Sequence, residues 1–255
     1  MAMTAHVLIV AGTDSSGGAG LSRDVETVAT FGLRSAIAVT AVTVQTHTSV
    51  ERIEPMPPDL VAEQMRAALA SSRVAAIKIG MLSGNATIEA VAAVLRDQDK
   101  LPVVLDPVLA SSSGRSLLGP EAIGSLTREL MPLCAIATPN LIELGILTGE
   151  ETARDEAQVE HQARRLLETG CAAILVKGGH ATGPQSIDML VVRQGREPMH
   201  FVAPRLDKNM RGTGCMLASA IAAGLALGKP LEDCVHEAKR HVFEQIVSLG
   251  RRQPV

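Results

Sequence analysis

Strand-length runs rich in valine and isoleucine alternate along this 255-residue chain with longer stretches of helical periodicity. The predicted strands cover residues 6–11, 36–43, 75–79, 102–106, 134–138 and 173–177. The predicted helices cover about 18–31, 59–71, 86–97, 120–130, 156–169, 214–227 and 231–247. Because successive parallel strands are usually joined by a helix, this alternation predicts an α/β fold. The sheet would be mostly parallel, with helices on both faces.

Two further strand-like runs, 187–193 and 199–202, flank a turn at 194–197. They predict an antiparallel hairpin at the edge of the sheet. A length of 255 residues is near the upper size for one domain, and the sequence contains no internal repeat or linker-like stretch. We therefore expect a single domain over residues 1–255.

Composition excludes several classes of function. Hydrophobic residues make up 46% and charged residues 20% of the chain, and the formal net charge is only −3, which argues against nucleic acid or an anionic membrane as a partner. The first apolar run is too short to span a bilayer and is predicted as a strand, so we expect a cytoplasmic protein. The four cysteines are far apart and form no Cys-x-x-Cys pair, which indicates neither a zinc site nor a disulfide framework.

The motif Gly-Thr-Gly-Cys at 212–215 opens the alanine-rich helix predicted over 214–227. Unpaired N–H groups and the positive end of the helix dipole favour an anion in front of Gly212, Thr213 and Gly214. A thiol in the first helical turn, as at Cys215, is expected to have a pKa closer to neutrality and to serve as a general base or a nucleophile. For this motif alone, a tight loop followed by an ordinary buried cysteine explains the sequence equally well.

Polar side chains follow several predicted strands, and in parallel sheets ligands gather at these carboxyl ends. Asp106 ends one strand, and Asn140 and Glu143 follow the next. Carboxylates placed in this way suit Mg²⁺, which also takes water and phosphate ligands. Lys177 ends a further strand and is followed by glycines, which suits a nucleotide phosphate. Each of these residues alone is equally explained as an ordinary loop residue.

The loop at 12–20 has the glycine spacing of a P-loop, but Gly18 stands where that motif needs lysine, so a Walker-type phosphate site is excluded. A glycine-rich turn that lets backbone approach a small ligand remains open. Gln45 carries a donor and an acceptor, which suits a nitrogen heterocycle, and Met81 would lean into the same pocket. A solvated loop glutamine and a core methionine are the alternatives.

In combination these features are the parts needed for phosphoryl transfer from ATP to an alcohol, where positioning and charge neutralisation supply most of the acceleration. We expect Cys215 to take the hydroxyl proton while the N–H groups of 212–215 stabilise the charge on the transferred phosphoryl group.

Six segments of the chain are 11–20, 78–81, 105–108, 138–140, 176–180 and 212–215. They occur in the order found in hydroxymethylpyrimidine/phosphomethylpyrimidine kinases of thiamine biosynthesis. The chain resembles these kinases over nearly its whole length. These enzymes belong to the ribokinase superfamily. The resemblance implies a three-layer αβα ribokinase-like fold with no separate lid domain, usually as a homodimer. It also implies ATP and Mg²⁺ as cofactors, and phosphorylation of the alcohol and then of its monophosphate.

The resemblance further implies roles for individual residues. Cys215 would be the base, in the place where most sugar kinases of the superfamily carry aspartate. The aminopyrimidine would lie among Gly12, Asp24, Thr43, Gln45, Met81 and Val108. The nucleotide would be held by Lys177, Asn140, Gly179 and Thr213, and the metal by Asp106 and Glu143.

Arg211 departs from the family pattern, in which histidine commonly precedes Gly-Thr-Gly-Cys. We hypothesise that its positive charge beside the anion site favours a phosphorylated substrate. Three alternatives stay open: a vitamin B6 kinase acting on pyridoxal-type rings, a cysteine hydrolase or acyltransferase with a histidine base, and a sensor that binds the pyrimidine without catalysis. The candidate histidines for the hydrolase are His180, His200, His236 and His241.

Overall fold

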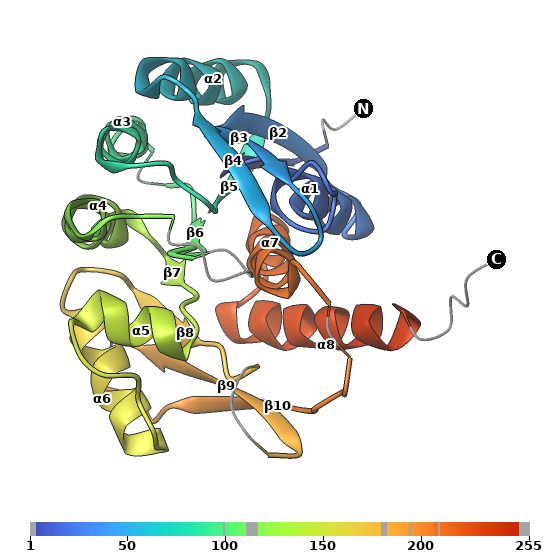
Figure 1. Cartoon of the computed structure of the whole chain (residues 1–255), viewed down its shortest axis with the longest axis vertical. Helices are drawn as coiled ribbons and strands as arrows, with labels where there is room; N and C mark the ends of the chain where they lie inside the picture. The colour runs from blue at the N-terminus through green and yellow to red at the C-terminus, as the bar shows by residue number, and fades with distance from the viewer. Residues whose placement is uncertain are drawn as a thin grey trace.

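The computed structural model of the chain describes residues 4–98, 100–110, 117–179, 183–193, 195–208 and 210–249. Its main sheet has eight strands in the order β10-β9-β8-β7-β6-β5-β1-β2 (Figure 1). These strands are β1 (His6–Ala11), β2 (Arg34–Val39), β5 (Val74–Ile79), β6 (Val103–Leu105), β7 (Ile136–Ala137), β8 (Ala173–Val176), β9 (Gln185–Val192) and β10 (Met199–Pro204). The pairs from β2 through β8 are parallel, and β9 pairs antiparallel with both β8 and β10. The predicted α/β fold with an antiparallel edge hairpin is confirmed.

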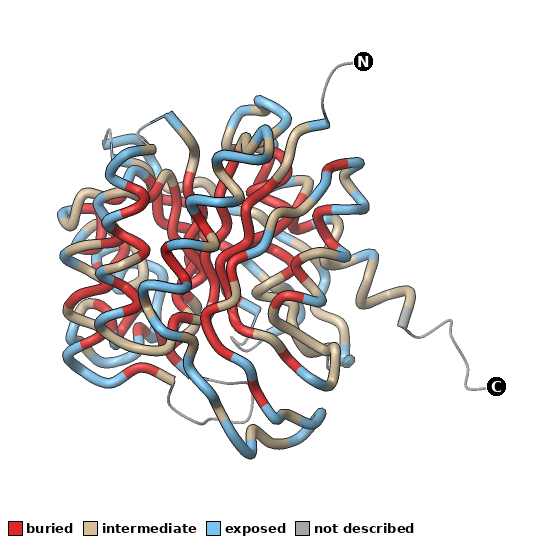
Figure 2. Tube along the Cα trace, turned by 90° about the horizontal axis from the view of Figure 1, so that it is seen from above, coloured by how far each residue is buried: buried red, intermediate tan, exposed pale blue. Residues whose placement is uncertain are grey.

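Helices cover both faces of this sheet. Alternate side chains of β1 enter two separate cores: Leu8 and Val10 pack on one face, and Val7 and Ile9 on the other. The first core includes side chains from α2 (Pro58–Ser71), α3 (Asn85–Leu95), α4 (Pro120–Ser125), α5 (Leu141–Thr148) and α6 (Glu156–Leu167). The second includes α1 (Gly20–Thr30), α7 (Thr213–Ala226) and α8 (Leu231–Leu249). Figure 2 shows the buried strands enclosed between the helical layers. Strands buried on both faces have nearly continuous apolar sequences, which is why these strands could be predicted from the sequence.

The expected helices are present, and their ends differ from the predicted ones by at most two residues, with one exception. The stretch predicted as a helix over 120–130 is α4 followed by a π-helical turn, Leu126–Leu130. A short 3-10 turn, Met131–Leu133, then leads to β7. Helix α5 was not expected from the sequence.

The strand predicted over 36–43 was wrong in one respect, because it is two strands in two sheets. At Thr40 the chain leaves the main sheet: its N–H donates to Ala11 O, and its Oγ1 donates to Met81 O at 2.6 Å. The chain then continues as β3 (Ala41–Gln45), which pairs antiparallel with β4 (Val50–Pro55) to form a second, two-stranded sheet. The valine and threonine run is continuous across this break, so apolar periodicity alone could not locate it.

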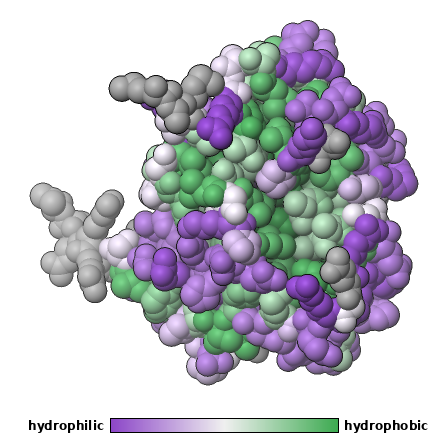
Figure 3. Space-filling model, turned by 180° about the vertical axis from the view of Figure 1, so that it is seen from behind, coloured by the Kyte–Doolittle hydropathy of each residue, from purple (hydrophilic) through white to green (hydrophobic). Residues whose placement is uncertain are grey.

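Hydrophobic side chains also reach the surface. On the face opposite that of Figure 1 they gather near the middle, with hydrophilic side chains around them (Figure 3). The large hydrophobic side chains that are exposed over the molecule as a whole include Ile37, Val42, Val44, Leu60, Ile142, Ile146, Ile187, Val202 and Leu227. Within the described ranges, no helix is long and apolar enough to cross a bilayer.

Candidate active site

Helix α7 begins against the glycine-rich loop that follows β1. Its N-cap, Gly212, has φ +75°, and a side chain there would collide with Gly18 O. Glycine is therefore required both by the left-handed backbone and by the close approach. From Met216 to Gly224 every residue of α7 is buried, so the helix is anchored in the core and presents its first turn, with Thr213 and Gly214, at the edge of the sheet.

The Cys215 thiol is less acidic than its position at the helix start predicts. Burial raises its pKa to about 11, and the nearby Lys78 ammonium only partly opposes this effect. The expectation of a pKa near neutrality was wrong because the loss of hydration outweighs the helix dipole and the neighbouring cation. The thiol is therefore protonated at neutral pH in the unliganded protein.

Lys177, Asp106 and the start of α7 lie together. Lys177 Nζ is 2.7 Å from Asp106 Oδ1 and 3.8 Å from Glu143 Oε2. A Cβ added to Gly214 would lie 3.2 Å from Lys177 Nζ and 3.6 Å from Asp106 Oδ2. Burial alone would lower the pKa of Lys177, but the carboxylates of Asp106 and Glu143 raise it above its ordinary value, so the cation is retained. The structure thus brings a cation, two carboxylates and a helix N-terminus to one place.

Asn140 and Glu143 form a capping box at the start of α5. Asn140 Oδ1 accepts from Glu143 N at 2.9 Å, and Glu143 Oε2 accepts from Asn140 N at 2.8 Å. Burial raises the pKa of the Glu143 carboxyl, with Lys177 acting in the opposite direction. An asparagine followed three residues later by glutamate is a helix-start signal that the sequence contained and that our reading took only as metal and nucleotide ligands.

The residues expected around the pyrimidine are distributed over strand β3 and the segments that follow β1, β5 and β6. Thr43 Oγ1 donates to Thr13 O at 2.8 Å, and it also lies 3.3 Å from Gln45 Oε1. A Cβ on Gly12 would lie 3.2 Å from Met81 Sδ, so these two residues are close neighbours. Val108 follows Asp106, and its N–H donates to Asp106 O at 2.9 Å.

Asp24 is not a surface residue of α1. It is fully buried, with Oδ2 2.7 Å from Lys78 Nζ and Oδ1 accepting from Ser219 Oγ at 2.8 Å. Both of its carboxylate oxygens thus have partners in the protein, and its contact with the pyrimidine stays a prediction. Sequence reasoning assigned no role to Lys78 or Ser219, because nothing in either local pattern signals an ion pair with a residue 54 positions away.

The charge of Arg211 is already balanced. Its Nη2 lies 3.1 Å from Asp14 Oδ2, and its Nη1 donates to Ser16 Oγ and to Thr46 O, each at 2.9 Å. The hypothesis of a free positive charge for a phosphorylated substrate therefore needs correction. Arg211 instead connects the start of α7 to the loop after β1 and to the turn of the β3–β4 hairpin.

The glycines after Lys177 differ in their surroundings. Gly178 N donates to Asp188 Oδ1 at 2.9 Å, whereas a Cβ on Gly179 would meet no atom of the described residues within 4 Å. His180, which completes the motif, lies outside the described residues. Two of the histidines considered for a hydrolase have other partners: His200 Nε2 lies 2.9 Å from Glu156, and His241 stacks edge-on against Phe31.

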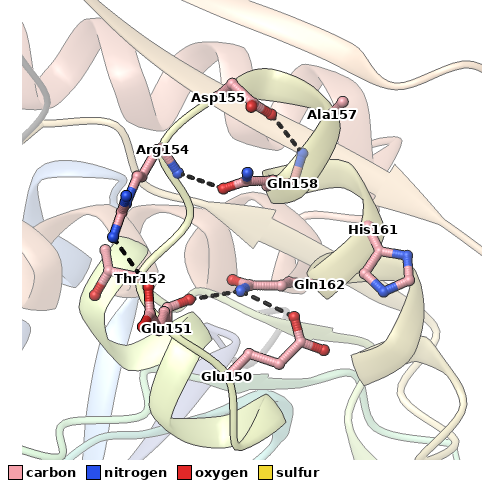
Figure 4. A pocket seen from close by; sticks show the side chains of 9 residues that line it. All are labelled: Glu150, Glu151, Thr152, Arg154, Asp155, Ala157, Gln158, His161 and Gln162. Atoms are coloured by element: carbon pink, nitrogen blue, oxygen red, sulfur yellow. Dashed lines mark hydrogen bonds and ion pairs between the residues drawn. The ribbon is translucent and has the colours of Figure 1, made fainter.

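A cavity of about 520 Å³ lies away from these residues, where the end of α5 connects to α6 (Figure 4). Several of its lining side chains bond to one another, as in the contact of Gln162 Nε2 with Glu150 Oε2 at 3.1 Å. It contains none of the residues that the sequence indicated as functional.

Solved structures that share this fold are kinases. The crystal structure of phosphomethylpyrimidine kinase from Clostridium difficile is 32% identical, has a TM-score of 0.81, and covers 95% of this chain and 99% of that chain. Pyridoxal kinase from Staphylococcus aureus in complex with pyridoxal is 28% identical, with a TM-score of 0.86, and covers 96% of this chain and 88% of that one. The protein is thus a kinase with a ribokinase-like fold.

The sequence narrows this class to one family. Residues 14–252 match the family described as phosphomethylpyrimidine kinase. A hydroxymethylpyrimidine/phosphomethylpyrimidine kinase from Rhizobium meliloti is 42% identical over 250 residues, which are 98% of this chain and 93% of the relative. The Escherichia coli enzyme of the same name is 40% identical over 235 residues, covering 92% and 88%. This chain belongs to the phosphomethylpyrimidine kinase family.

Proposed function

We propose that this protein transfers a phosphoryl group from ATP to the hydroxymethyl group of 4-amino-5-hydroxymethyl-2-methylpyrimidine, and then a second one to the monophosphate product, in thiamine diphosphate biosynthesis. The names of the R. meliloti and E. coli relatives contain both activities. The observation that carries the proposal is the convergence of Lys177 and Asp106 on Gly214, at the first turn of α7. This arrangement suits a phosphoryl group in transfer, because positive charge and N–H donors face the same point.

The proposed reaction uses the chain's own groups as follows. In the first transfer the O–H bond of the alcohol breaks as its proton passes to Cys215, and the alcohol oxygen forms a bond to the γ-phosphorus while the bond from that phosphorus to the bridging oxygen of ADP breaks. In the second transfer an ionised oxygen of the monophosphate forms the bond to the γ-phosphorus, and no proton has to be removed. The N–H groups of Gly212, Thr213, Gly214 and Cys215 would stabilise the negative charge on the transferred group. Lys177 would stabilise the charge that develops on ADP. Only the thiolate of Cys215 can accept the proton, so the groups that favour the thiolate matter for the rate.

The residues near Lys177 fit a magnesium ion. Asp106 and Glu143 both face the same ammonium, and Mg²⁺ in phosphoryl-transfer sites commonly takes one or two carboxylates and completes its shell with water and phosphate. Among the described residues, no group of three or more His, Cys, Asp or Glu side chains is placed to hold a metal ion by itself. Asp106 and Glu143 would therefore hold Mg²⁺ only together with the nucleotide, and the metal would neutralise phosphate charge.

For the pyrimidine we propose a pocket formed by Gly12, Thr43, Gln45, Met81 and Val108. Gln45 is the last residue of β3 in the β3–β4 hairpin, and its side chain offers both a donor and an acceptor to the ring nitrogens. Asn140, Gly179 and Thr213 would contact the nucleotide. A homodimer is also proposed, on the family resemblance alone.

The base role of the thiol is tested with Cys215→Ala in a coupled ADP-release assay on hydroxymethylpyrimidine and on its monophosphate. We expect kcat on the alcohol to fall at least about 100-fold, because general-base catalysis typically contributes that much, while the Kd for ATP changes little. The loss on the monophosphate should be smaller, since its acceptor oxygen is already ionised at neutral pH. The matched control is Cys234→Ala, which removes a buried cysteine that packs against Gly224 at the far end of α7 and should retain activity. Near-native turnover by Cys215→Ala would refute the assignment.

Pyridoxal phosphorylation is the second candidate function, favoured by the similarity to S. aureus pyridoxal kinase, whose structure contains pyridoxal. The chain is more similar in sequence to hydroxymethylpyrimidine/phosphomethylpyrimidine kinases, at 40–42% identity, than to that enzyme, at 28%. We therefore expect kcat/KM to be higher on hydroxymethylpyrimidine than on pyridoxal. The reverse order would make vitamin B6 the substrate class.

A further inference from the structure

An ion pair without any exposed surface lies between β5, α1 and α7. Lys78 Nζ is 2.7 Å from Asp24 Oδ2, and both side chains are 0% exposed. Ser219 of α7 donates to the other carboxylate oxygen of Asp24 at 2.8 Å. The pair and the serine hydroxyl thus connect one strand of the sheet to two helices of the same layer.

This pair lies beneath the first turn of α7. Ser219 follows Cys215 by four residues, so the two side chains lie on the same face of the helix, one turn apart. The Lys78 side chain extends along β5 toward its carboxyl end, because a Cβ added to Gly80 would lie only 2.7 Å from Lys78 Nζ. The ammonium is therefore held at the edge of the sheet where Cys215 lies.

Charged groups from three different segments affect the pKa of the Cys215 thiol. Lys78 on β5 lowers the pKa of the Cys215 thiol, while Asp24 on α1 and Asp106 after β6 raise it. Cys215 in turn helps to raise the pKa of both Lys78 and Lys177. Lys78 exerts the largest effect of a charged neighbour, so the ion pair as a whole favours the thiolate.

Stability alone gives no reason for this arrangement. Removing two charges from water costs several kcal/mol for each ion, and well-packed apolar residues of similar volume are often as stabilising as a buried pair. Lys78 occupies a position on a central strand whose neighbours Ile77 and Ile79 are also fully buried, where an apolar side chain would be expected.

We propose that Lys78 and Asp24 are positioning residues for Cys215: the buried ammonium stabilises negative charge on the sulfur, and Asp24, fixed by Ser219, keeps the ammonium beneath α7. The catalytic consequence rests on the proposed function, in which the thiolate accepts the substrate proton. The acidity of the thiol, however, can be measured without turnover, so failure of one statement is distinguishable from failure of the other.

The test measures the alkylation rate of Cys215 by iodoacetamide, followed by mass spectrometry of the peptide that contains this residue, at several pH values. The rate reports the thiolate fraction, because the thiolate is the nucleophile. The variant Lys78→Met with Asp24→Asn removes both charges and leaves no buried ion unpaired. We expect its alkylation to be at least about twofold slower at each pH below the thiol pKa, because Lys78 lowers that pKa more than Asp24 raises it.

Two controls separate charge from packing. Ser219→Ala keeps both charges and removes one hydrogen bond, so alkylation should change by less than about twofold. Lys229→Met with Glu237→Gln removes another partly buried ion pair, at 2.7 Å beyond the far end of α7, and should leave the Cys215 rate unchanged. Unchanged or faster alkylation in the Lys78 and Asp24 double variant overturns the proposal.

Should that double variant fail to fold, Lys78→Gln alone supplies a second test. It removes the ammonium that lowers the pKa of the Cys215 thiol and leaves an amide that can still donate to Asp24, so alkylation of Cys215 should again become slower. Equal or faster alkylation in this variant would also overturn the proposal, whatever the activity of Cys215→Ala.

Discussion

At the residue scale, the position of Lys177 depends on the glycine that follows it. Gly178 lies against β9 so closely that a Cβ would collide with Ile187 O. Its N–H donates to Asp188, which is nearly buried and also pairs with Lys239 at 2.8 Å. The chain therefore turns away from β8 at a point where no side chain fits, and this turn fixes the direction of Lys177.

Gly178→Ala should destabilise the protein strongly, whereas Gly179→Ala should not. The methyl group of the first variant meets backbone that cannot move away without separating β8 from β9, so we expect a loss of about 2 kcal/mol or more in the free energy of unfolding. The methyl group of the second points into open space. Urea unfolding of both variants checks this difference, and equal midpoints would contradict it.

The positions of single residues were predictable where they followed from the topology of the sheet. Lys177 and Asp106 end different strands, and the rule that ligands gather at carboxyl ends was enough to place them together. The acidity of Cys215 was not predictable, because the helix position is visible in the sequence but the burial that raises the thiol pKa is not. The burial of Asp24 was not predictable for the same reason, since its partner Lys78 on β5 is brought to it only by the fold.

At the scale of elements, the residues that cap α5 also contact Lys177 of the proposed nucleotide site. Its N-terminus is closed by the reciprocal bonds of Asn140 and Glu143, and Asn140 also bridges to Lys177 across the sheet edge. Lys177 N donates to Pro139 O at 2.8 Å, directly before the cap. The start of α5 and the end of β8 are thus held as one unit.

Asn140→Ala should cost about 1 kcal/mol of stability through loss of the cap, and should also raise the KM for ATP. The matched variant is Asp155→Ala, which removes the N-cap of α6, where Asp155 Oδ1 accepts from Gln158 N at 2.8 Å. Because α6 begins away from Lys177, this variant should lose similar stability with an unchanged KM. Thermal unfolding and ATP saturation curves measure the two effects, and equal KM values in the two variants would argue against the connection.

Helices and strands were predictable from the periodicity of apolar residues, except where one apolar run continues from one sheet into another. The break at Thr40 depends on hydrogen bonds to Ala11 O and Met81 O, and both partners are remote in sequence. Strand β4 was missed because its side chains are exposed or half-buried, so it shows no buried apolar face. Helix α5 has eight residues, and its composition does not distinguish it from a buried strand.

At the scale of the whole molecule, Arg211 holds together parts of the chain that are far apart in sequence. It bonds to Asp14 and Ser16, which lie 197 and 195 positions away, and to Thr46, which lies 165 positions away. The loop after β1, the turn of the β3–β4 hairpin and the start of α7 meet at this one guanidinium. These are also the segments that contain Gln45 and the proposed anion site, so we infer that Arg211 sets the shape of the substrate pocket.

Arg211→Met should therefore loosen the β3–β4 hairpin and raise the KM for the pyrimidine alcohol. Asp14 is 5% exposed and would lose its ion partner, so we also expect a loss of about 2 to 3 kcal/mol in stability, limited because Ser16 still bonds to it. Arg211→Lys should not restore the native KM, since an ammonium cannot reproduce the forked geometry that reaches three groups.

The control lies in the same hairpin. Arg52→Met removes the exposed pair of Arg52 with Glu54, which contributes little to stability, and should leave both the KM and the hairpin unchanged. Amide hydrogen exchange of Ala41–Gln45 and Val50–Pro55 reports the opening of the hairpin directly. Faster exchange in Arg211→Met than in Arg52→Met is expected because Arg211 bonds Thr46 of the hairpin turn to the start of α7, whereas Arg52 pairs with Glu54 of the hairpin itself. Equal exchange in the two variants would mean that β3 and β4 are held by their own contacts with the main sheet, and that the guanidinium only balances the charge of Asp14.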